Sequence, residues 1–210
     1  NEGDKDFAGA LHVVEADLAS VSLGDEEVKA LAALTKVVRI TLRGDFSNDS
    51  LRALSRLIHL RELTISSHNV TDDGLRFIAT LPRLQYLDIR ETTATGKGLA
   101  HLQNLSELRK LFMPVTSVAD QQIELLAKMS KLEILDLSDS PITDEGATEL
   151  TKLANLKALI IPGSKVTDKG IKELVNLPKL QFLHLDGALV SNKVIEEIRR
   201  NKPDLVIVGK

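Results

Sequence analysis

Histidine is the side chain best suited to acid–base chemistry near neutral pH, and the chain carries five of them. They are scattered along the sequence, and no two have the spacing of paired metal ligands. These residues are His12, His59, His68, His101 and His184. The chain contains no cysteine, which excludes disulfides, thiolate nucleophiles and Cys-type zinc sites. The sequence patterns of serine hydrolases, zinc proteases and phosphate-binding loops are also absent.

Two aspartates and a histidine are the one set of residues with regular spacing. Asp88, Asp136 and His184 follow one another at intervals of 48 residues. They fall at the same outward position of three predicted strands, which are separated by one strand each. Strands two apart lie on the order of 10 Å from each other, which is too far for a hydrogen-bonded relay. We therefore expect no catalytic residues, no metal and no cofactor, and a protein that is not an enzyme.

The regular spacing of these residues follows from a repeat. The pattern L-x-x-L-x-x-L-x-L occurs six times between Leu57 and Leu185. The last aliphatic of each copy lies 24 residues after the previous one, at Ile65, Ile89, Met113, Leu137, Ile161 and Leu185. Weaker copies extend in both directions, which indicates about eight repeats and a terminal strand. Such self-similarity at a fixed period is the signature of a stacked repeat protein.

Each repeat also carries a signal for the start of a helix. The sequences V-T-D-D-G-L at Val70, I-T-D-E-G-A at Ile142 and V-T-D-K-G-I at Val166 follow the predicted strands. Thr and Asp accept hydrogen bonds from the free N–H groups of a first helical turn. A strand and a short helix cannot bury their apolar faces alone, so the repeats must stack. A doubly wound α/β domain would not repeat at this fixed period, and it would carry a glycine-rich phosphate loop, which the sequence lacks.

With these motifs the chain resembles leucine-rich repeat proteins over nearly all of its length. The resemblance implies an α/β solenoid, a right-handed arc with a parallel sheet on the concave face and helices on the convex face. We expect a single domain spanning residues 1–210, with residues 1–36 forming an N-terminal cap and first repeat, and residues 203–210 forming a closing strand. The family mostly acts by recognising proteins, so the resemblance also implies protein binding.

One column of the repeat differs from the commonest family pattern, which has Asn or Cys there. This chain has hydroxyl residues at Thr92, Thr116, Ser140 and Ser164, with His68 and Ala188 as outliers. We expect these hydroxyls to face inward and bond the backbone of the turn. The T-D-x-G-L type is similar to repeats of bacterial proteins, particularly planctomycete ones.

Charge and hydropathy restrict the partners. The net charge is −3, with −5 in residues 1–36 and +2 elsewhere, so we expect no nucleic-acid binding. No apolar run is long enough to span a membrane. The chain begins with Asn1, which indicates processing or trimming; removal of an export signal is one explanation, and the localisation stays open.

The concave face is the most informative surface, because every second residue of a strand points outward. Its N-terminal half is polar and charged, whereas aromatic, aliphatic and proline residues appear from the fourth repeat onward. Exposed apolar clusters with aromatic anchors usually mark partner sites. The expected binding residues are Tyr86, Asp88, Arg90, Phe112, Pro114, Ile134, Asp136, Ile160, Phe182 and His184.

We therefore predict a non-enzymatic scaffold that binds a protein or peptide through this face. A structural or targeting repeat domain of a larger, exported protein is the alternative. Self-association through the same surface is a third interpretation of the apolar cluster. An enzyme acting on polysaccharide or peptide would need converging acid–base groups, which the sequence does not offer.

Overall fold

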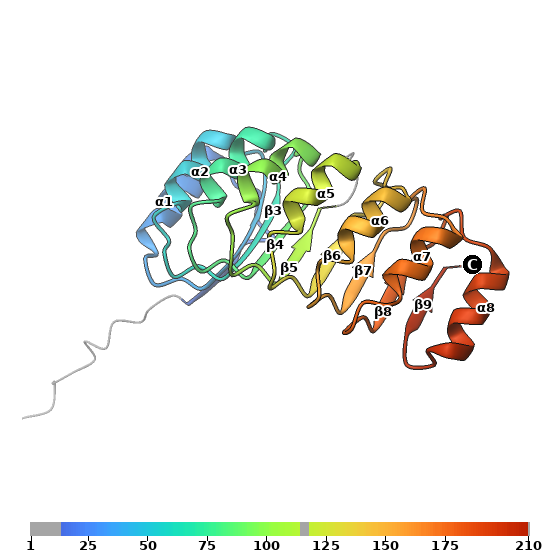
Figure 1. Cartoon of the computed structure of the whole chain (residues 1–210). Coiled ribbons are helices and arrows are strands. Elements are labelled where there is room, and N and C mark those ends of the chain that lie inside the picture. Colours follow the sequence, from blue (N-terminus) through green and yellow to red (C-terminus); the bar gives the residue numbers. More distant parts are fainter. Residues whose placement is uncertain (1–13, 114–117, 210) are drawn as a thin grey trace, which may run out of the picture.

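The computed structural model describes residues 14–113 and 118–209. Within these ranges nine strands form one parallel sheet in chain order, and a helix or helical turn lies between successive strands (Figure 1). The strands are β1 Glu15–Asp17, β2 Arg39–Arg43, β3 Glu62–Ser66, β4 Tyr86–Glu91, β5 Lys110–Phe112, β6 Ile134–Asp136, β7 Ala158–Ile160, β8 Phe182–His184 and β9 Val206–Val208. The predicted α/β solenoid is confirmed.

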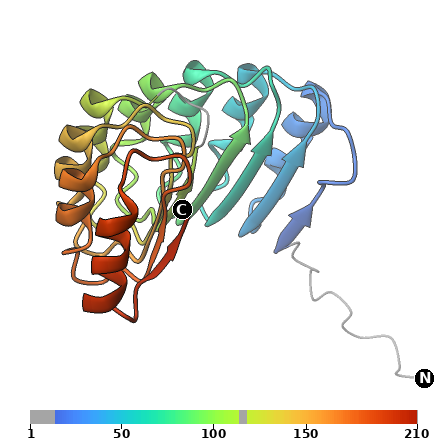
Figure 2. The same cartoon turned by 90° about the vertical axis from the view of Figure 1, so that its right-hand side faces the viewer.

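The helices form a second layer on one side of the sheet, as the view along the array makes clear (Figure 2). They are α1 Asp25–Ala30, α2 Asn48–Leu54, α3 Asp72–Ile78, α4 Leu99–Leu102, α5 Asp120–Leu126, α6 Asp144–Leu150, α7 Asp168–Leu174 and α8 Asn192–Asn201. Short 3-10 turns at Leu31–Ala33 and Gly96–Gly98 adjoin α1 and α4. The other face of the sheet is left uncovered by helices.

The aliphatic core lies between the two layers. The second residue of each strand pairs with its counterpart on the next strand, so one aliphatic row crosses the sheet, half-buried at Ala16 on β1 and buried from β2 to β9. Leu135 and Leu159 in this row have no exposed surface. Leu137 and Ile161, which directly follow β6 and β7 as the second aliphatic of each Leu-x-Leu pattern, are equally buried. This burial places the predicted Leu-x-Leu residues inward and their neighbours outward.

A ladder of carboxylates joins successive helix starts. The Asp at the start of one helix accepts hydrogen bonds from the backbone N–H and the hydroxyl of the residue that caps the next helix. Thr167, for example, donates both groups to Asp144, at N–O and O–O distances of 2.8 and 2.6 Å. The same arrangement joins Asp25 to Ser47, Asp72 to Thr95, Asp120 to Thr143 and Asp168 to Ser191, and Asn48 replaces Asp in its bond with Thr71.

The glycine of the T-D-x-G motif makes room for this ladder. A Cβ on Gly170 would lie 2.4 Å from the Asp144 carboxylate, and one on Gly146 would lie 2.3 Å from Asp120. In addition, the Gly170 N–H donates to Asp144 at 3.0 Å. The three motif residues therefore act across a repeat boundary, because the Thr and Gly of one repeat bind the Asp of the previous one.

The ladder is interrupted once, between α4 and α5. The position of the missing Asp is Gly96, and the Thr and Gly that would bind it are replaced by Ala119 and Gln122. Here the Ala119 N–H donates to the side chain of Gln122 at 3.0 Å. Gly24 makes the same kind of bond to Glu27 in the first described repeat. A local cap thus replaces the bond between repeats where its partner is missing.

The hydroxyl column differs in part from the expectation. Thr92 donates to the Ile89 carbonyl, as predicted for this column. Ser140 and Ser164 are buried, but their hydroxyls have no hydrogen-bond partner among the described residues, so the predicted backbone bond is wrong for these two. Both hydroxyls end within the aliphatic core instead. Thr116 lies outside the described residues.

Strand β9 lies at the C-terminal edge of the sheet. It pairs with β8 through Val206, Ile207 and Val208, and Leu205 and Ile207 are buried against the last repeat. Its other edge pairs with no strand among the described residues. Because Val206 and Val208 alternate with Ile207, they lie on the face of the sheet that the helices leave uncovered.

Candidate functional site: the concave face of the sheet

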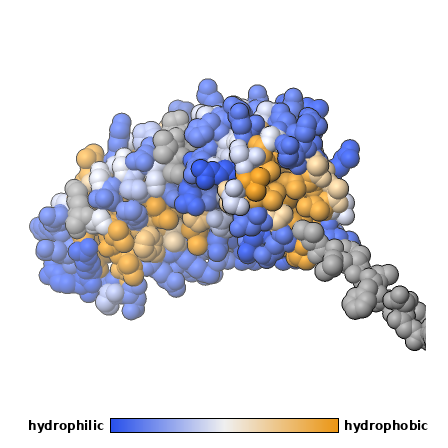
Figure 3. All heavy atoms as spheres, turned by 180° about the vertical axis from the view of Figure 1, so that it is seen from behind, coloured by the Kyte–Doolittle hydropathy of each residue, from blue (hydrophilic) through white to orange (hydrophobic). Residues whose placement is uncertain are grey.

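Two rows of outward residues cross the uncovered face of the sheet. One row runs from Glu15 and Arg39 on the first two strands to Phe182 and Val206 on the last two, and the other from Asp17 to Val208. Seen from the sheet side, apolar surface gathers over the C-terminal strands, and hydrophilic surface separates it from a second apolar area near the N-terminal end (Figure 3). The register therefore brings most of the predicted binding residues onto one surface.

The centre of this face holds two aromatic rings and an ion pair. The rings of Tyr86 and Phe112 lie 5.3 Å apart, measured between their centroids. Arg90 donates to Asp88 at 2.6 Å and places its guanidinium carbon 5.4 Å from the centroid of Phe112. The Tyr86 hydroxyl donates to Asp88 at 3.3 Å. Four of the predicted residues are thus in mutual contact.

The electrostatics of this cluster keep its charges in place. The hydrogen bond to Asp88 raises the pKa of Arg90, so the guanidinium stays protonated. Burial raises the pKa of the Tyr86 hydroxyl, and the Asp88 carboxylate raises it further, so the phenol stays neutral and donates. The cluster therefore presents an ion pair with no net charge beside two aromatic rings.

Two predicted residues are much less exposed than a concave surface position implies. Asp88 is 3% exposed and Asp136 is 8% exposed, so the expectation of solvent-facing carboxylates is wrong for both. Asp88 is covered by Arg90 and Tyr86, and Asp136 accepts bonds from the Ser138 N–H and hydroxyl. Period-two alternation gives the direction of a side chain, but residues that fold back along the strand determine its exposure.

The strand register also shifts at one point. The sequence alignment of repeats places Ser66 beside Arg90, whereas the structure pairs Ser66 with Glu91 after an irregularity between Thr64 and Ser66. The extra residue in β4 lets Arg90 turn back onto Asp88, while Glu91 accepts a hydrogen bond from Ser66. Pro114, the next residue predicted in this column, lies outside the described residues.

Asp88, Asp136 and His184 remain separate. Phe112 pairs between the two aspartates, and Ile160 pairs between Asp136 and His184, so one strand intervenes each time. Among residues 14–113 and 118–209, no three or more His, Cys, Asp or Glu side chains converge in a way that could hold a metal ion. The three residues therefore do not form one site, and two of them are buried.

The C-terminal half of the face forms an apolar patch, which we define as Phe112, Ile134, Ala158, Ile160, Phe182, Val206 and Val208. The first five are half-buried, while Val206 and Val208 are 55% and 40% exposed. Sequence reasoning missed both valines as binding residues, although their alternation with Leu205 and Ile207 signals their direction. Across β5 to β9 the patch extends about 19 Å at ~4.8 Å per strand.

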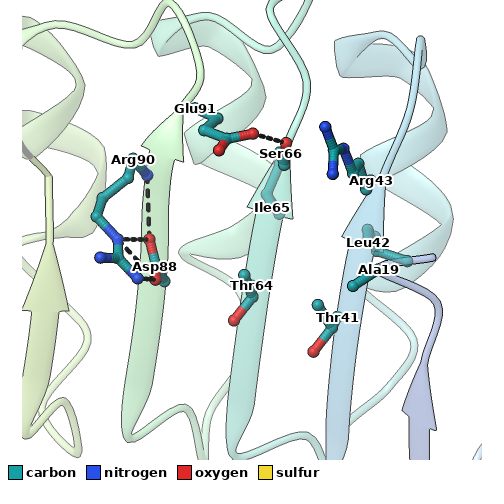
Figure 4. Close-up of a pocket in the computed structure, with 10 residues that line it drawn as sticks. All are labelled: Ala19, Thr41, Leu42, Arg43, Thr64, Ile65, Ser66, Asp88, Arg90 and Glu91. Atoms are coloured by element: carbon teal, nitrogen blue, oxygen red, sulfur yellow. Dashed lines mark hydrogen bonds and ion pairs between the residues drawn. The ribbon is translucent and has the colours of Figure 1, made fainter. Parts of the chain in front are cut away.

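The N-terminal half contains a polar hollow of about 360 Å³, which ten residues of β2–β4 and the preceding turn line (Figure 4). Hydroxyls from Thr41, Thr64 and Ser66 line its floor and rim, together with Arg43 and Glu91. At the N-terminal end of β2, the Arg39 guanidinium forms ion pairs with Glu15 and Glu62, at N–O distances of 3.6 and 2.6 Å. Arg43 is a further residue that the predicted site omitted.

The repeat geometry and a match to a family model together decide the fold family. A model described as leucine-rich repeat matches residues 56–79 and 128–150. The protein has the leucine-rich repeat fold. This agrees with the resemblance found in the sequence, although the matched repeats cover only part of the array. A comparison with curated protein sequences finds no match. The predicted similarity to planctomycete repeats stays untested.

Solved leucine-rich repeat structures support the same fold. An internalin C2 from Listeria monocytogenes is 22% identical with a TM-score of 0.70, over 90% of this chain and 77% of that chain. A second internalin from the same organism, inlF, is 17% identical with a TM-score of 0.64, over 86% of this chain and 56% of that chain. At these identities the likeness concerns the fold alone. In the described part of the chain, no helix has the length and apolar character of a bilayer-spanning segment.

Proposed function

We propose that this leucine-rich repeat protein is a non-enzymatic scaffold that binds an extended segment of a protein partner along its apolar patch. The observation that carries the proposal is the patch itself. Helices cover the opposite face of the sheet, yet half-exposed Phe112, Phe182 and two valines line this one. Contiguous apolar surface with aromatic anchors and a charged rim is typical of binding sites.

The shape of the patch favours a peptide segment over a small molecule. An extended chain advances ~3.3 Å per residue, so about six residues cover the 19 Å between β5 and β9. The sheet face here is open, whereas small-molecule sites are usually enclosed pockets that bury most of the ligand. Side chains of the partner would lie over the rows of Ile134 and Ile160, between the two phenylalanines.

A selection from a random peptide display library tests the proposal and does not require the partner to be identified. We expect selected peptides to be rich in aromatic and aliphatic residues. Replacing both anchors, Phe112→Ala with Phe182→Ala, should weaken binding by at least ~30-fold, because burial of an interface anchor commonly contributes ~2 kcal/mol or more. Dissociation constants are measured by fluorescence anisotropy, and circular dichroism checks that the double variant remains folded.

Two exposed aliphatic residues outside the patch serve as matched controls. Ile58 and Leu189 are 54% and 63% exposed, and neither lies on a strand of the sheet. Their alanine variants should bind the peptides as the parent chain does. Equal losses at control and patch positions contradict the proposal. A concentration-dependent dimer in analytical ultracentrifugation that the double variant abolishes assigns the patch to self-association instead.

A further inference from the structure

The polar hollow beside the apolar patch has one cation that nothing in the described structure neutralises. Arg43 is exposed at the end of β2 and extends toward Ser66 (Figure 4). Arg90, the other cation of the hollow, is held by Asp88. The acidic Glu91 accepts a hydrogen bond from Ser66. No described side chain forms an ion pair with Arg43, so its guanidinium donors are free to receive a partner.

The neighbours of Arg43 suit a carboxylate. The Thr41 hydroxyl, two residues earlier on the same face of β2, has no hydrogen-bond partner in the described part of the chain. A guanidinium with a nearby hydroxyl can hold both oxygens of a carboxylate. Among the described outward residues from β2 to β6, the charged side chains that make neither a hydrogen bond nor an ion pair are the cations Arg43 and Lys110. Glu91 and Asp136 form no ion pair, but their carboxylates accept hydrogen bonds from Ser66 and Ser138.

We propose that the polar hollow binds an acidic side chain, Asp or Glu, of the same partner segment that occupies the apolar patch. This inference rests on the proposed function and adds the charge and spacing of the partner. Three strand spacings of ~4.8 Å separate β2 from β5, and Arg43 lies two residues further along its strand than Thr41, the β2 member of the Phe112 row. The distance is therefore about 16 Å.

That distance sets the spacing between the acidic residue and the first apolar anchor in the partner. At ~3.3 Å per residue, the acidic residue precedes or follows the first apolar anchor by about five residues. The segment crosses the strands, with its acidic end over β2 and its apolar part over β5 to β9. Charge complementarity thus identifies an acidic and apolar peptide as the occupant of this face.

A charge exchange tests the assignment with peptides of known composition. A patch-binding peptide is made in three C-terminally amidated forms, with Glu, Gln or Lys five residues from its first aromatic residue, on either side. The parent chain should bind the Glu form about tenfold more tightly than the Gln form. In the Arg43→Gln chain this difference should disappear, and in the Arg43→Glu chain the Lys form should bind best.

Two further variants sharpen the result. Glu91→Gln removes a competing negative charge from the hollow, so the Glu form should gain affinity a few-fold. Arg56→Gln removes an exposed arginine that lines a different depression, between α1 and α2, and should change nothing. Because Arg43 is exposed and has no side-chain partner, its variants should keep the melting temperature of the parent. The Gln form is also made with a free C-terminal carboxylate. If this peptide binds as tightly as the amidated Glu form, the hollow binds a chain terminus, and the side-chain proposal is wrong.

The outcomes separate this inference from the proposed function. If the parent chain binds all three peptides alike, or if Arg43→Gln keeps the preference of the parent, while Phe112→Ala with Phe182→Ala abolishes binding, the hollow is not an acidic subsite, and the apolar patch still binds the partner. If the aromatic double variant binds as tightly as the parent, the proposed function itself is wrong. A preference for the Lys form by the parent chain reverses the inferred charge of the partner.

Discussion

Removal of one carboxylate from the ladder should destabilise the protein without touching the core. Asp144 accepts hydrogen bonds from the Thr167 N–H, the Thr167 hydroxyl and the Gly170 N–H, at 2.8, 2.6 and 3.0 Å. Loss of a helix-capping side chain costs ~0.5–2 kcal/mol, and bonds to charged groups lie above the average for hydrogen bonds. Because Asp144 is only half-buried, water can hydrogen-bond the Thr167 and Gly170 donors in the variant and offset part of this cost. We expect Asp144→Ala to lower the free energy of unfolding by about 2 kcal/mol.

Urea denaturation followed by far-ultraviolet circular dichroism measures this change. For a chain of this size the loss corresponds to a fall of about 4–8 °C in melting temperature. Glu145→Ala is the matched control, because Glu145 lies in the same first turn but its exposed side chain makes no hydrogen bond among the described residues. It should change stability by no more than ~0.5 kcal/mol.

A third variant distinguishes the hydrogen bonds from the charge. Asn48 already forms the equivalent bonds with Thr71, so Asp144→Asn should retain most of the stability at neutral pH. If Asp144→Ala and Glu145→Ala destabilise equally, or if Asp144→Asn is as damaging as alanine, the ladder does not connect the repeats in the way described.

Three other predictions concern the same helix starts and the hydroxyl column. Burial would raise the pKa of Asp144, but the hydrogen bonds from Thr167 outweigh it, so the pKa lies below the ordinary value of 3.8. The stabilisation by Asp144 is therefore complete well above pH 3.8 and lost as the pH falls through the lower folded value; denaturation between pH 6 and pH 3 should show a weaker pH dependence for Asp144→Asn. Gln122→Ala should cost about 1 kcal/mol because it leaves the Ala119 N–H uncapped, whereas exposed Gln121→Ala should have little effect in the same urea titration. Ser164→Ala should leave stability unchanged or raise it by up to ~1 kcal/mol, while Thr92→Ala, which loses a bond to Ile89, should lower it; a large loss at Ser164 would mean that its hydroxyl is bonded.

The spacing of apolar residues predicts most of the fold. Leu135 and Leu159 are inward because a strand alternates and the repeat has a fixed period, and both are local rules that hold whichever strand lies alongside. The T-D-x-G motif likewise predicts where α6 and α7 begin. It does not reveal that the Asp binds the following repeat, because that bond depends on how two helices stack.

The candidate site is predictable in direction but not in detail. Phe112 and Phe182 lie on the expected face, since the strand register follows from the repeat. The burial of Asp88 could not be predicted, because it depends on Arg90 folding back after an irregularity in β4. Arg43 was visible in the sequence as an outward cation, but only the contacts of Arg90 and Glu91 distinguish it as the unpaired one in the hollow.

The most direct test of peptide binding on the concave face is isoleucine methyl NMR of the chain with and without a selected peptide. Ile134 and Ile160 lie within the apolar patch, and Ile58 is an exposed isoleucine outside it. We expect the methyl signals of Ile134 and Ile160 to shift in proportion to occupancy while that of Ile58 stays in place. A shift of Ile58 with unchanged Ile134 and Ile160 signals would locate the partner away from the sheet face and contradict the proposed function.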